Sequence, residues 1–382
     1  MHRDSLNWAI FCRVIDNFGD IGVCWRLARQ LMQVHGQQVT LWVDDLTSFH
    51  AIEPAVDASA DRQTVDGAVV RHWHAQACDG VAAQDVADVV IEAFACDIPD
   101  PYIRAMQQRS VPPLWINLEY LSAEDWVTDF HLGHSPVHNL GKTFFFPGFT
   151  EGTGGLLFDA HLPALSQCFA AAEARQALLQ AFGFQVKVAG ARLISLFAYE
   201  NPALPDLLEQ LQALAQPVIL LVPEGRISAG LHQWLGEPLV AGQQLNRGGL
   251  TLCGLPFMPQ SRYDELLAAC DLNFVRGEES FVRAQMLGKP MVWHIYQQEE
   301  DAHLVKLEAF LQRYLQAADE ALREPLLHLF RSWNQPGLKL PDLAPLLSAP
   351  EGWQRHCADW QQSLLALGDL ASNLVHYARN RV

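Results

Sequence analysis

The stretch that most constrains the fold covers residues 271–290 and reads DLNFVRGEESFVRAQMLGKP. Its first part, residues 272–275, is short and apolar, which is typical of a buried parallel strand. Residues 281–287 carry apolar side chains at helical spacing, and Gly288 and Pro290 end that helix. A strand and a helix separated by so few residues indicate one step of an α/β sheet.

The loop at residues 276–280 lies at this predicted junction. Such a junction points backbone N–H groups and the positive end of a helix dipole at a bound group, which suits a phosphate. Arg276 adds a permanent cation with a forked set of donors. Glu278 and Glu279 would repel a diphosphate, so they suit sugar hydroxyls. The alternative is that these acids only favour a helix N-terminus.

The rest of the chain repeats the alternation of strands and helices, which predicts parallel sheets. At 382 residues the chain is long enough for two domains, and the second series of strands begins near residue 185. Helices are expected at 23–34 and 170–182. The pattern is helical from residue 301 onward, and leucines keep helical spacing over 353–378. Strands are expected at residues 7–15, 39–43, 69–73, 89–94, 114–118, 193–197, 218–222, 250–253, 272–275 and 291–294.

Composition excludes several classes of function. With 26 Lys and Arg against 43 Asp and Glu, the net charge of −17 gives no general attraction to nucleic acid or an anionic membrane, and favours a basic protein partner. No apolar run reaches membrane-spanning length, and Arg13 and Asp16 interrupt the N-terminal one. The eight cysteines form no CxxC pair and are expected to be reduced and buried. These features predict a cytoplasmic protein.

The first predicted loop, residues 16–22, occupies the position of a dinucleotide-binding fingerprint. It lacks the G-x-G-x-x-G pattern and carries Asp16 and Asp20, which argues against NAD, even though Asp44 and Asp45 imitate the ribose-binding acid. The two aspartates could form a general base and its electrostatic partner. Alternatively, they cap the helix that follows.

Two further loops follow predicted strands of the second domain. Tyr199 and Phe257 are candidates for stacking on a base or sugar ring, and Gln260 for reading its polar edge. Core packing is the alternative for both aromatic rings.

The sequence contains no clear motif for a metal site or a catalytic nucleophile. His131, His134 and His138 are close in sequence, but Gly133 and Pro136 oppose a regular helix there and no H-E-x-x-H pattern occurs. No D-x-D pair, G-x-S-x-G motif or Walker loop is present either. We expect no bound metal.

Six segments occur together in a diagnostic order, and with them the chain resembles the EarP family, the bacterial protein-arginine rhamnosyltransferases that modify translation elongation factor P. The resemblance extends from about residue 7 to past residue 300. The segments are FCRVIDNFGDIGVCWRLARQL, VVIEAFACDIP, WINLEYLSAEDW, FFFPGFTEGTGGL, SLFAYEN and LPFMPQSRYDELLAACDLNFVRGEESFVRAQMLGKPMVWHIYQQEEDAH.

This resemblance implies a GT-B fold, in which two Rossmann-like domains face each other and a C-terminal helix returns to the first. The acceptor-binding domain would then cover residues 1–184, completed by about 355–382, and the nucleotide-sugar-binding domain residues 185–354. The implied donor is dTDP-β-L-rhamnose, and the implied acceptor is an arginine of elongation factor P. Transfer would invert the anomeric centre without metal or cofactor.

The resemblance also assigns roles to residues. Asp20 would be the general base, with Asp16 beside it and Glu278 as a further carboxylate for the acceptor guanidinium. The acceptor-side loop would include Asn17, Phe18 and Gly19. The donor site would be lined by Tyr199, Phe257, Gln260, Arg276, Glu278, Glu279 and Ser280, with Glu279 standing where the family often has Asp.

Two alternatives remain open at this stage. A GT-B transferase or epimerase with another substrate would keep the loop of Arg276 but need not keep both aspartates. A sugar-nucleotide-gated binding protein for a translation factor would bind without turnover.

Overall fold

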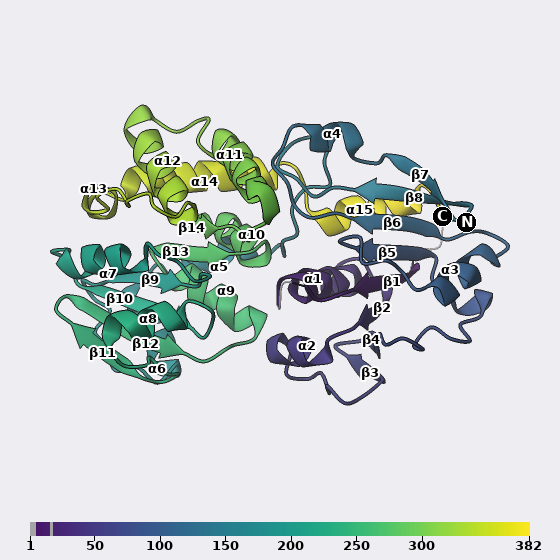
Figure 1. Ribbon diagram of the computed structural model, residues 1–382, viewed down its shortest axis with the longest axis horizontal. Coiled ribbons are helices and arrows are strands. Elements are labelled where there is room, and N and C mark those ends of the chain that lie inside the picture. Colours follow the sequence, from purple (N-terminus) through teal and green to yellow (C-terminus); the bar gives the residue numbers. More distant parts are fainter. Residues whose placement is uncertain (1–4, 16–17) are drawn as a thin grey trace. The chain divides into compact units, whose positions relative to one another are not determined.

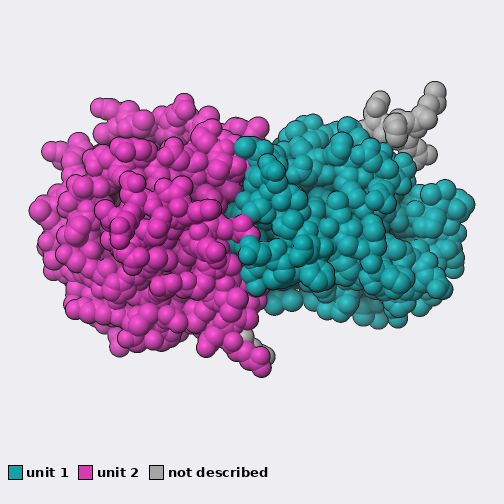
Figure 2. Space-filling model, turned by 90° about the horizontal axis from the view of Figure 1, so that it is seen from above, with its two compact units in different colours: residues 1–159, 366–382 teal, residues 160–365 magenta. Residues whose placement is uncertain are grey.

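The computed structural model describes residues 5–15 and 18–382 (Figure 1). The chain forms two compact units (Figure 2): unit 1 contains residues 1–159 and 366–382, and unit 2 contains residues 160–365. The first division falls after residue 159, not after 184, because the intervening helices bond within unit 2. Ser166 donates to the carbonyl of Leu287 at 2.6 Å, and Arg175 forms an ion pair with Asp271 at 2.8 Å.

Unit 1 is built on an eight-stranded sheet in the order β3-β4-β2-β1-β5-β6-β8-β7, whose inner pairings are parallel. Its strands are β1 (Asn7–Cys12), β2 (Gln38–Val43), β3 (Arg62–Val65), β4 (Ala68–His72), β5 (Val89–Ala93), β6 (Leu114–Leu118), β7 (His134–Val137) and β8 (Leu140–Phe145). Its helices are α1 (Gly19–Gln33), α2 (Leu46–Ile52), the 3-10 turn η1 (Ala83–Asp85), α3 (Asp100–Gln107), α4 (Trp126–Phe130) and α15 (Leu370–Arg379).

Unit 2 has a six-stranded sheet in the order β11-β12-β10-β9-β13-β14. Its strands are β9 (Arg192–Leu196), β10 (Val218–Pro223), β11 (Gln244–Arg247), β12 (Leu250–Leu255), β13 (Leu272–Arg276) and β14 (Met291–His294). Its helices are α5 (Leu162–Cys168), α6 (Ala172–Ala181), α7 (Leu204–Ala213), α8 (Ser228–Leu235), α9 (Gln260–Ala269), α10 (Glu279–Met286), η2 (Glu299–Asp301), α11 (Ala302–Tyr314), α12 (Glu320–Asn334), α13 (Ala344–Ser348) and α14 (Glu351–Leu365). Every residue of β9, β10 and β13 is buried, as expected where both faces of a sheet are covered.

The chain returns to unit 1 at its end, as the predicted C-terminal helix requires. The leucines at helical spacing over residues 353–378 belong to two helices, because Gly368, at φ +74°, separates α14 from α15. Asn373 of α15 donates to the carbonyl of Gly154 at 3.0 Å. A Cβ at Gly154 would lie 2.5 Å from the ring of Phe145, so the backbone of this glycine-rich segment approaches its neighbours too closely for a side chain.

The three antiparallel edge strands β3, β7 and β11 were not predicted from the sequence. Each has only four residues and half-exposed side chains, so it lacks the apolar run that reveals a central strand. The Asp66-Gly67 turn between β3 and β4 was an available signal, because Asp-Gly is typical of a two-residue hairpin.

All eight cysteines are free thiols, and seven are buried as predicted. The eighth, Cys168, is exposed at the end of α5, so that part of the prediction was wrong. Across the described ranges 5–15 and 18–382, we find no helix with the length and apolar character needed to cross a membrane.

Candidate active site

The predicted strand, loop and helix around residue 276 are present in unit 2 as β13 and α10. Gly277 has φ +61°, a conformation that glycine adopts without strain, and its carbonyl accepts a hydrogen bond from the Trp293 indole at 2.7 Å. Ser280 donates to the carbonyl of Arg276 at 2.5 Å and accepts from its N–H at 3.2 Å. The turn is therefore fixed before any ligand binds.

The guanidinium of Arg276 lies between aromatic rings at the carboxyl end of β13. Its central carbon is 4.3 Å from the ring centroid of Phe197 and 4.8 Å from that of Tyr199. Arg276 is 8% exposed, as is Tyr199. Stacking on ring faces holds the guanidinium plane without using its N–H donors in the plane. The arrangement suits a cation kept ready for an anionic group.

Gln260 and Glu279 extend this cluster. Gln260 is the first residue of α9, and its amide donates to the Glu279 carboxylate at 3.5 Å. Glu278 is the N-cap residue of α10 but makes no side-chain capping bond, which does not favour the view that it serves only to cap the helix. Glu279 does lie in the first turn, where an acid stabilises a helix. Phe257 follows β12 at the same carboxyl edge of the sheet and is half-buried.

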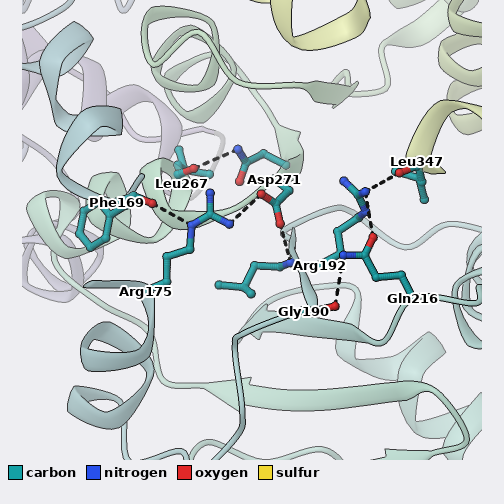
Figure 3. A network of polar contacts seen from close by, with 10 residues as sticks. Phe169, Arg175, Gly190, Arg192, Gln216, Leu267, Asp271 and Leu347 are labelled. Atoms are coloured by element: carbon teal, nitrogen blue, oxygen red, sulfur yellow. Dashed lines mark hydrogen bonds and ion pairs between the residues drawn. The ribbon is translucent and has the colours of Figure 1, made fainter. Parts of the chain in front are cut away.

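The opposite edge of this sheet is closed by a structural network (Figure 3). Asp271 accepts from Arg175 at 2.8 Å and from the backbone N–H of Leu193 at 2.9 Å. Arg192 donates to Gln216 at 3.0 Å. Because Asp271 is paired with Arg175 and bonded to the backbone of β9, it belongs to the scaffold, whereas the candidate binding residues lie at the carboxyl ends of the strands.

His294 was not predicted as a site residue; it ends β14 and pairs in register with Arg276 of β13. Its ring lies 5.3 Å from that of Tyr199 and 5.8 Å from that of Trp333. Burial, together with the charges of Arg276 and His303, lowers the pKa of His294 to about 4. The imidazole is therefore neutral at pH 7 and adds no second charge beside Arg276.

In unit 1, Asp20 is the second residue of α1 and is 3% exposed. Its carboxylate accepts from the backbone N–H of Ile15 at 2.8 Å and from the hydroxyl of Tyr120 at 3.1 Å. Asp20 is thus not the N-cap residue of α1, a position that Phe18 occupies. Asp16 and Asn17 lie outside the described residues. Gly19 is the first residue of α1.

Tyr120 was not predicted from the sequence. Its ring stacks on Phe94 at a centroid distance of 4.3 Å, and Phe94 itself has φ +56°. A positive φ is strained for an aromatic residue, and such strain is most frequent near functional sites. Tyr120 follows β6 and Phe94 follows β5, so the carboxyl ends of two strands support the hydroxyl that contacts Asp20.

The acids that imitate a dinucleotide site have structural roles. Asp45 caps α2 by accepting from the N–H groups of Thr47 and Ser48. Asp44 accepts from the backbone N–H of Val14 at 2.8 Å.

The histidine cluster is also explained by local structure. His131 accepts from the backbone N–H of Phe146 at 3.1 Å, and His134 contacts the Thr143 hydroxyl at 2.9 Å. No group of three or more potential metal ligands occurs within the part of the chain that the structure describes.

Comparison with known proteins identifies the family. The family described as "Elongation-Factor P (EF-P) rhamnosyltransferase EarP" matches residues 8–379. A protein-arginine rhamnosyltransferase of Pseudomonas putida is 52% identical over 379 residues and covers 98% of both chains. The chain belongs to the EarP family. It is therefore a glycosyltransferase, of the class named protein-arginine rhamnosyltransferase in its relatives.

Further comparisons agree with membership of the EarP family. A protein-arginine rhamnosyltransferase of Pseudomonas aeruginosa is 49% identical over 374 residues, covering 97% of this chain and 98% of its own. The solved structure described as "Structural basis for EarP-mediated arginine glycosylation of translation elongation factor EF-P" is 38% identical, with a TM-score of 0.70 and coverage of 99% of this chain and 100% of that one. The fold is GT-B, as the resemblance implied.

Among the predicted donor residues, Arg276 contacts Tyr199 and Ser280, and Gln260 contacts Glu279. Phe257 and Glu278 lie after the carboxyl ends of β12 and β13 in the same sheet. Asp20 belongs to unit 1 and Glu278 to unit 2. The roles of all these residues stay predictions.

The neutral His294 gives a testable pH dependence. Its pKa is about 4 in the folded protein and about 6.5 in an unfolded chain, so between these values the unfolded state binds more protons and stability rises with pH. The contribution of His294 to the unfolding free energy is complete above pH 6.5. About 2 kcal/mol of that free energy is lost when the pH falls to 5. We expect His294→Gln to remove that part of the acid destabilisation, measured as urea unfolding free energy at pH 7 and pH 5. Exposed His328→Gln serves as the control, and equal pH slopes for His294→Gln and the wild type would contradict the assignment.

Proposed function

We propose that the chain transfers L-rhamnose from dTDP-β-L-rhamnose to an arginine side chain of elongation factor P in the cytoplasm, inverting the anomeric centre without metal or cofactor. The names of its relatives support the reaction class. The observation that carries the proposal is Asp20, a buried carboxylate held by two hydrogen bonds at the start of α1. A fixed carboxylate suits both binding and deprotonation of a guanidinium.

The proton must leave as the new bond forms. A guanidinium has a pKa of roughly 12.5 to 13.8 and a free carboxylate about 4, so Asp20 cannot deprotonate the arginine beforehand. In the proposed step the arginine nitrogen forms a bond to the anomeric carbon, and the bond from that carbon to the diphosphate oxygen breaks. Asp20 accepts the proton, and dTDP leaves with the electron pair.

The leaving group would be stabilised in unit 2. Arg276 and the N-terminus of α10 supply positive charge where the diphosphate gains negative charge. Tyr199 and Phe257 would stack on the base or sugar, and Gln260 would read a polar edge. Glu278 and Glu279 would contact sugar hydroxyls, with Asp16 and Glu278 as further contacts for the acceptor guanidinium.

We expect Arg276→Ala to weaken dTDP binding by about 10–100-fold, because a hydrogen bond to a charged group contributes about 1.5–3 kcal/mol. Arg276→Lys restores charge but not the planar fork that stacks on two rings, so it should recover only part of the affinity. Isothermal titration calorimetry with dTDP measures both. The control is Arg226→Ala, whose guanidinium lies farther from Tyr199, at 5.8 Å. Equal affinities for Arg276→Ala and the wild type would exclude Arg276 from the donor site.

The proposed function is tested by the intact mass of elongation factor P after incubation with the protein and dTDP-β-L-rhamnose. One added deoxyhexose, mapped to an arginine by tandem mass spectrometry, is expected. Conversion of the donor without change in the acceptor would favour an epimerase or another transferase. Binding of donor and acceptor without any chemical change would favour a sugar-nucleotide-gated binding protein.

A further inference from the structure

The short helix α4 of unit 1 exposes two large aromatic side chains. Trp126 is 43% exposed and Phe130 is 60% exposed, whereas Val127 between them is buried. The i, i+4 spacing places both rings on one side of the helix, edge to face at 5.8 Å. Trp126 also packs edge-on against Phe146 at 5.4 Å, so its ring is held in place. Neighbouring, preorganised aromatic rings left in water are typical of a protein-binding surface.

The surroundings of these rings are acidic. No lysine or arginine occurs between Arg109 and Lys142, while this stretch contains four carboxylates. Asp125 and Asp129 are exposed on or next to α4. A Cβ at Gly152 would lie 2.9 Å from Thr128, so the loop that carries the exposed Glu151 also lies against this helix. Together, Trp126 and Phe130 with Asp125, Asp129 and Glu151 form what we call the α4 surface.

The α4 surface lies at the carboxyl ends of the unit 1 strands, the end of the sheet at which Asp20 also lies. Helix α4 follows β6, and α1 follows β1, a parallel strand of the same sheet (Figure 1). Tyr120, in the connection between β6 and α4, contacts the Asp20 carboxylate directly. A protein whose side chain reaches Asp20 therefore approaches the edge where α4 is exposed.

We propose that the α4 surface docks a lysine- and arginine-bearing face of the protein acceptor. The proposal rests on the proposed function, and it adds where the acceptor is held and by which chemistry. Basic side chains can stack on the faces of Trp126 and Phe130 and form ion pairs with the surrounding carboxylates. Positive charge on the partner also steers its approach to an acidic surface, and this effect weakens as salt is added.

The test uses the full chain and elongation factor P without donor, with affinity measured by calorimetry at low and high salt. We expect Trp126→Ala/Phe130→Ala to raise the Kd and the KM for elongation factor P by about 10-fold or more, since buried aromatic anchors dominate interface energetics. Asp129→Lys should raise both by several-fold and reduce their salt dependence. The KM for the donor, and kcat at saturating acceptor, should stay at wild-type values in both variants.

Val34→Ala and Val111→Ala are matched controls, because these side chains are 67% and 66% exposed but lie at the other edge of the unit 1 sheet. They should leave the Kd unchanged. A Kd within twofold of wild type for both the aromatic and the Asp129 variants overturns the docking proposal. A wild-type protein that binds elongation factor P but never modifies it overturns the proposed function instead, while the variant affinities still decide the docking site.

Discussion

Replacing Asp20 with asparagine is expected to lower kcat by about 10²–10⁴-fold, the contribution of a general base, while donor affinity stays unchanged. Hydrogen bonds from Ile15 and from Tyr120 hold the carboxylate in place, so the substitution removes the proton acceptor from a fixed position. An asparagine of the same size fills the site, but its amide NH₂ cannot accept and carries no negative charge for a guanidinium. Single-turnover transfer with saturating elongation factor P and dTDP-β-L-rhamnose measures the effect.

Two further variants separate chemistry from loop structure. Asp44→Asn makes the same carboxylate-to-amide change at a residue that also accepts a backbone N–H, that of Val14, so it reports how much a neutralised acceptor beside this loop slows transfer without removing the base. Tyr120→Phe keeps the ring stacked on Phe94 but removes one donor to Asp20. The lost hydrogen bond favours the ionised carboxylate, so its removal should raise the pKa of Asp20. The acidic limb of the pH–kcat profile should then move to higher pH. If Asp44→Asn slows transfer as much as Asp20→Asn, the base assignment is wrong.

Much of the sheet architecture was predictable because central strands are apolar and continuous. The predicted ranges 114–118 and 291–294 coincide with β6 and β14, and Arg276 falls at the predicted strand-to-helix turn. The strands that were not predicted are those held by backbone pairing with a neighbouring strand. The edge strands β3, β7 and β11 pair through backbone hydrogen bonds and carry no apolar pattern.

Asp20 and Arg276 could be proposed for the candidate site from the sequence because each lies in a single loop next to a predicted strand. Tyr120 is 100 residues away from Asp20 in sequence, and its role depends on strands β1 and β6 ending at one sheet edge. In the sequence, nothing distinguishes His294 from other strand residues. Only the register between β13 and β14 places it beside Arg276. Such contacts between distant segments are set by topology, and no local pattern encodes them.

The second large effect concerns the ion pair that holds α10 in place. Arg283 of α10 makes two parallel hydrogen bonds to Asp264 of α9, at 3.0 and 2.7 Å, and the two side chains are 1% and 4% exposed. Asp264→Asn removes a negative charge beside a buried cation. We therefore expect a loss of about 3–5 kcal/mol in unfolding free energy, measured by urea denaturation of the full chain.

The exposed pair of Arg331 and Glu308 is a matched control. It has the same two-bond geometry, at 2.7 Å for both bonds, but its side chains are 46% and 47% exposed. Glu308→Gln should cost less than about 1 kcal/mol, because solvent screens an exposed pair. The double replacement Asp264→Leu/Arg283→Met should recover most of the stability lost in Asp264→Asn, because it leaves no unneutralised charge in the core. If Asp264→Asn and Glu308→Gln cost the same, burial does not govern the energy of this pair, and the buried apolar side chains of α10, such as Phe281 and Met286, hold the helix in place instead.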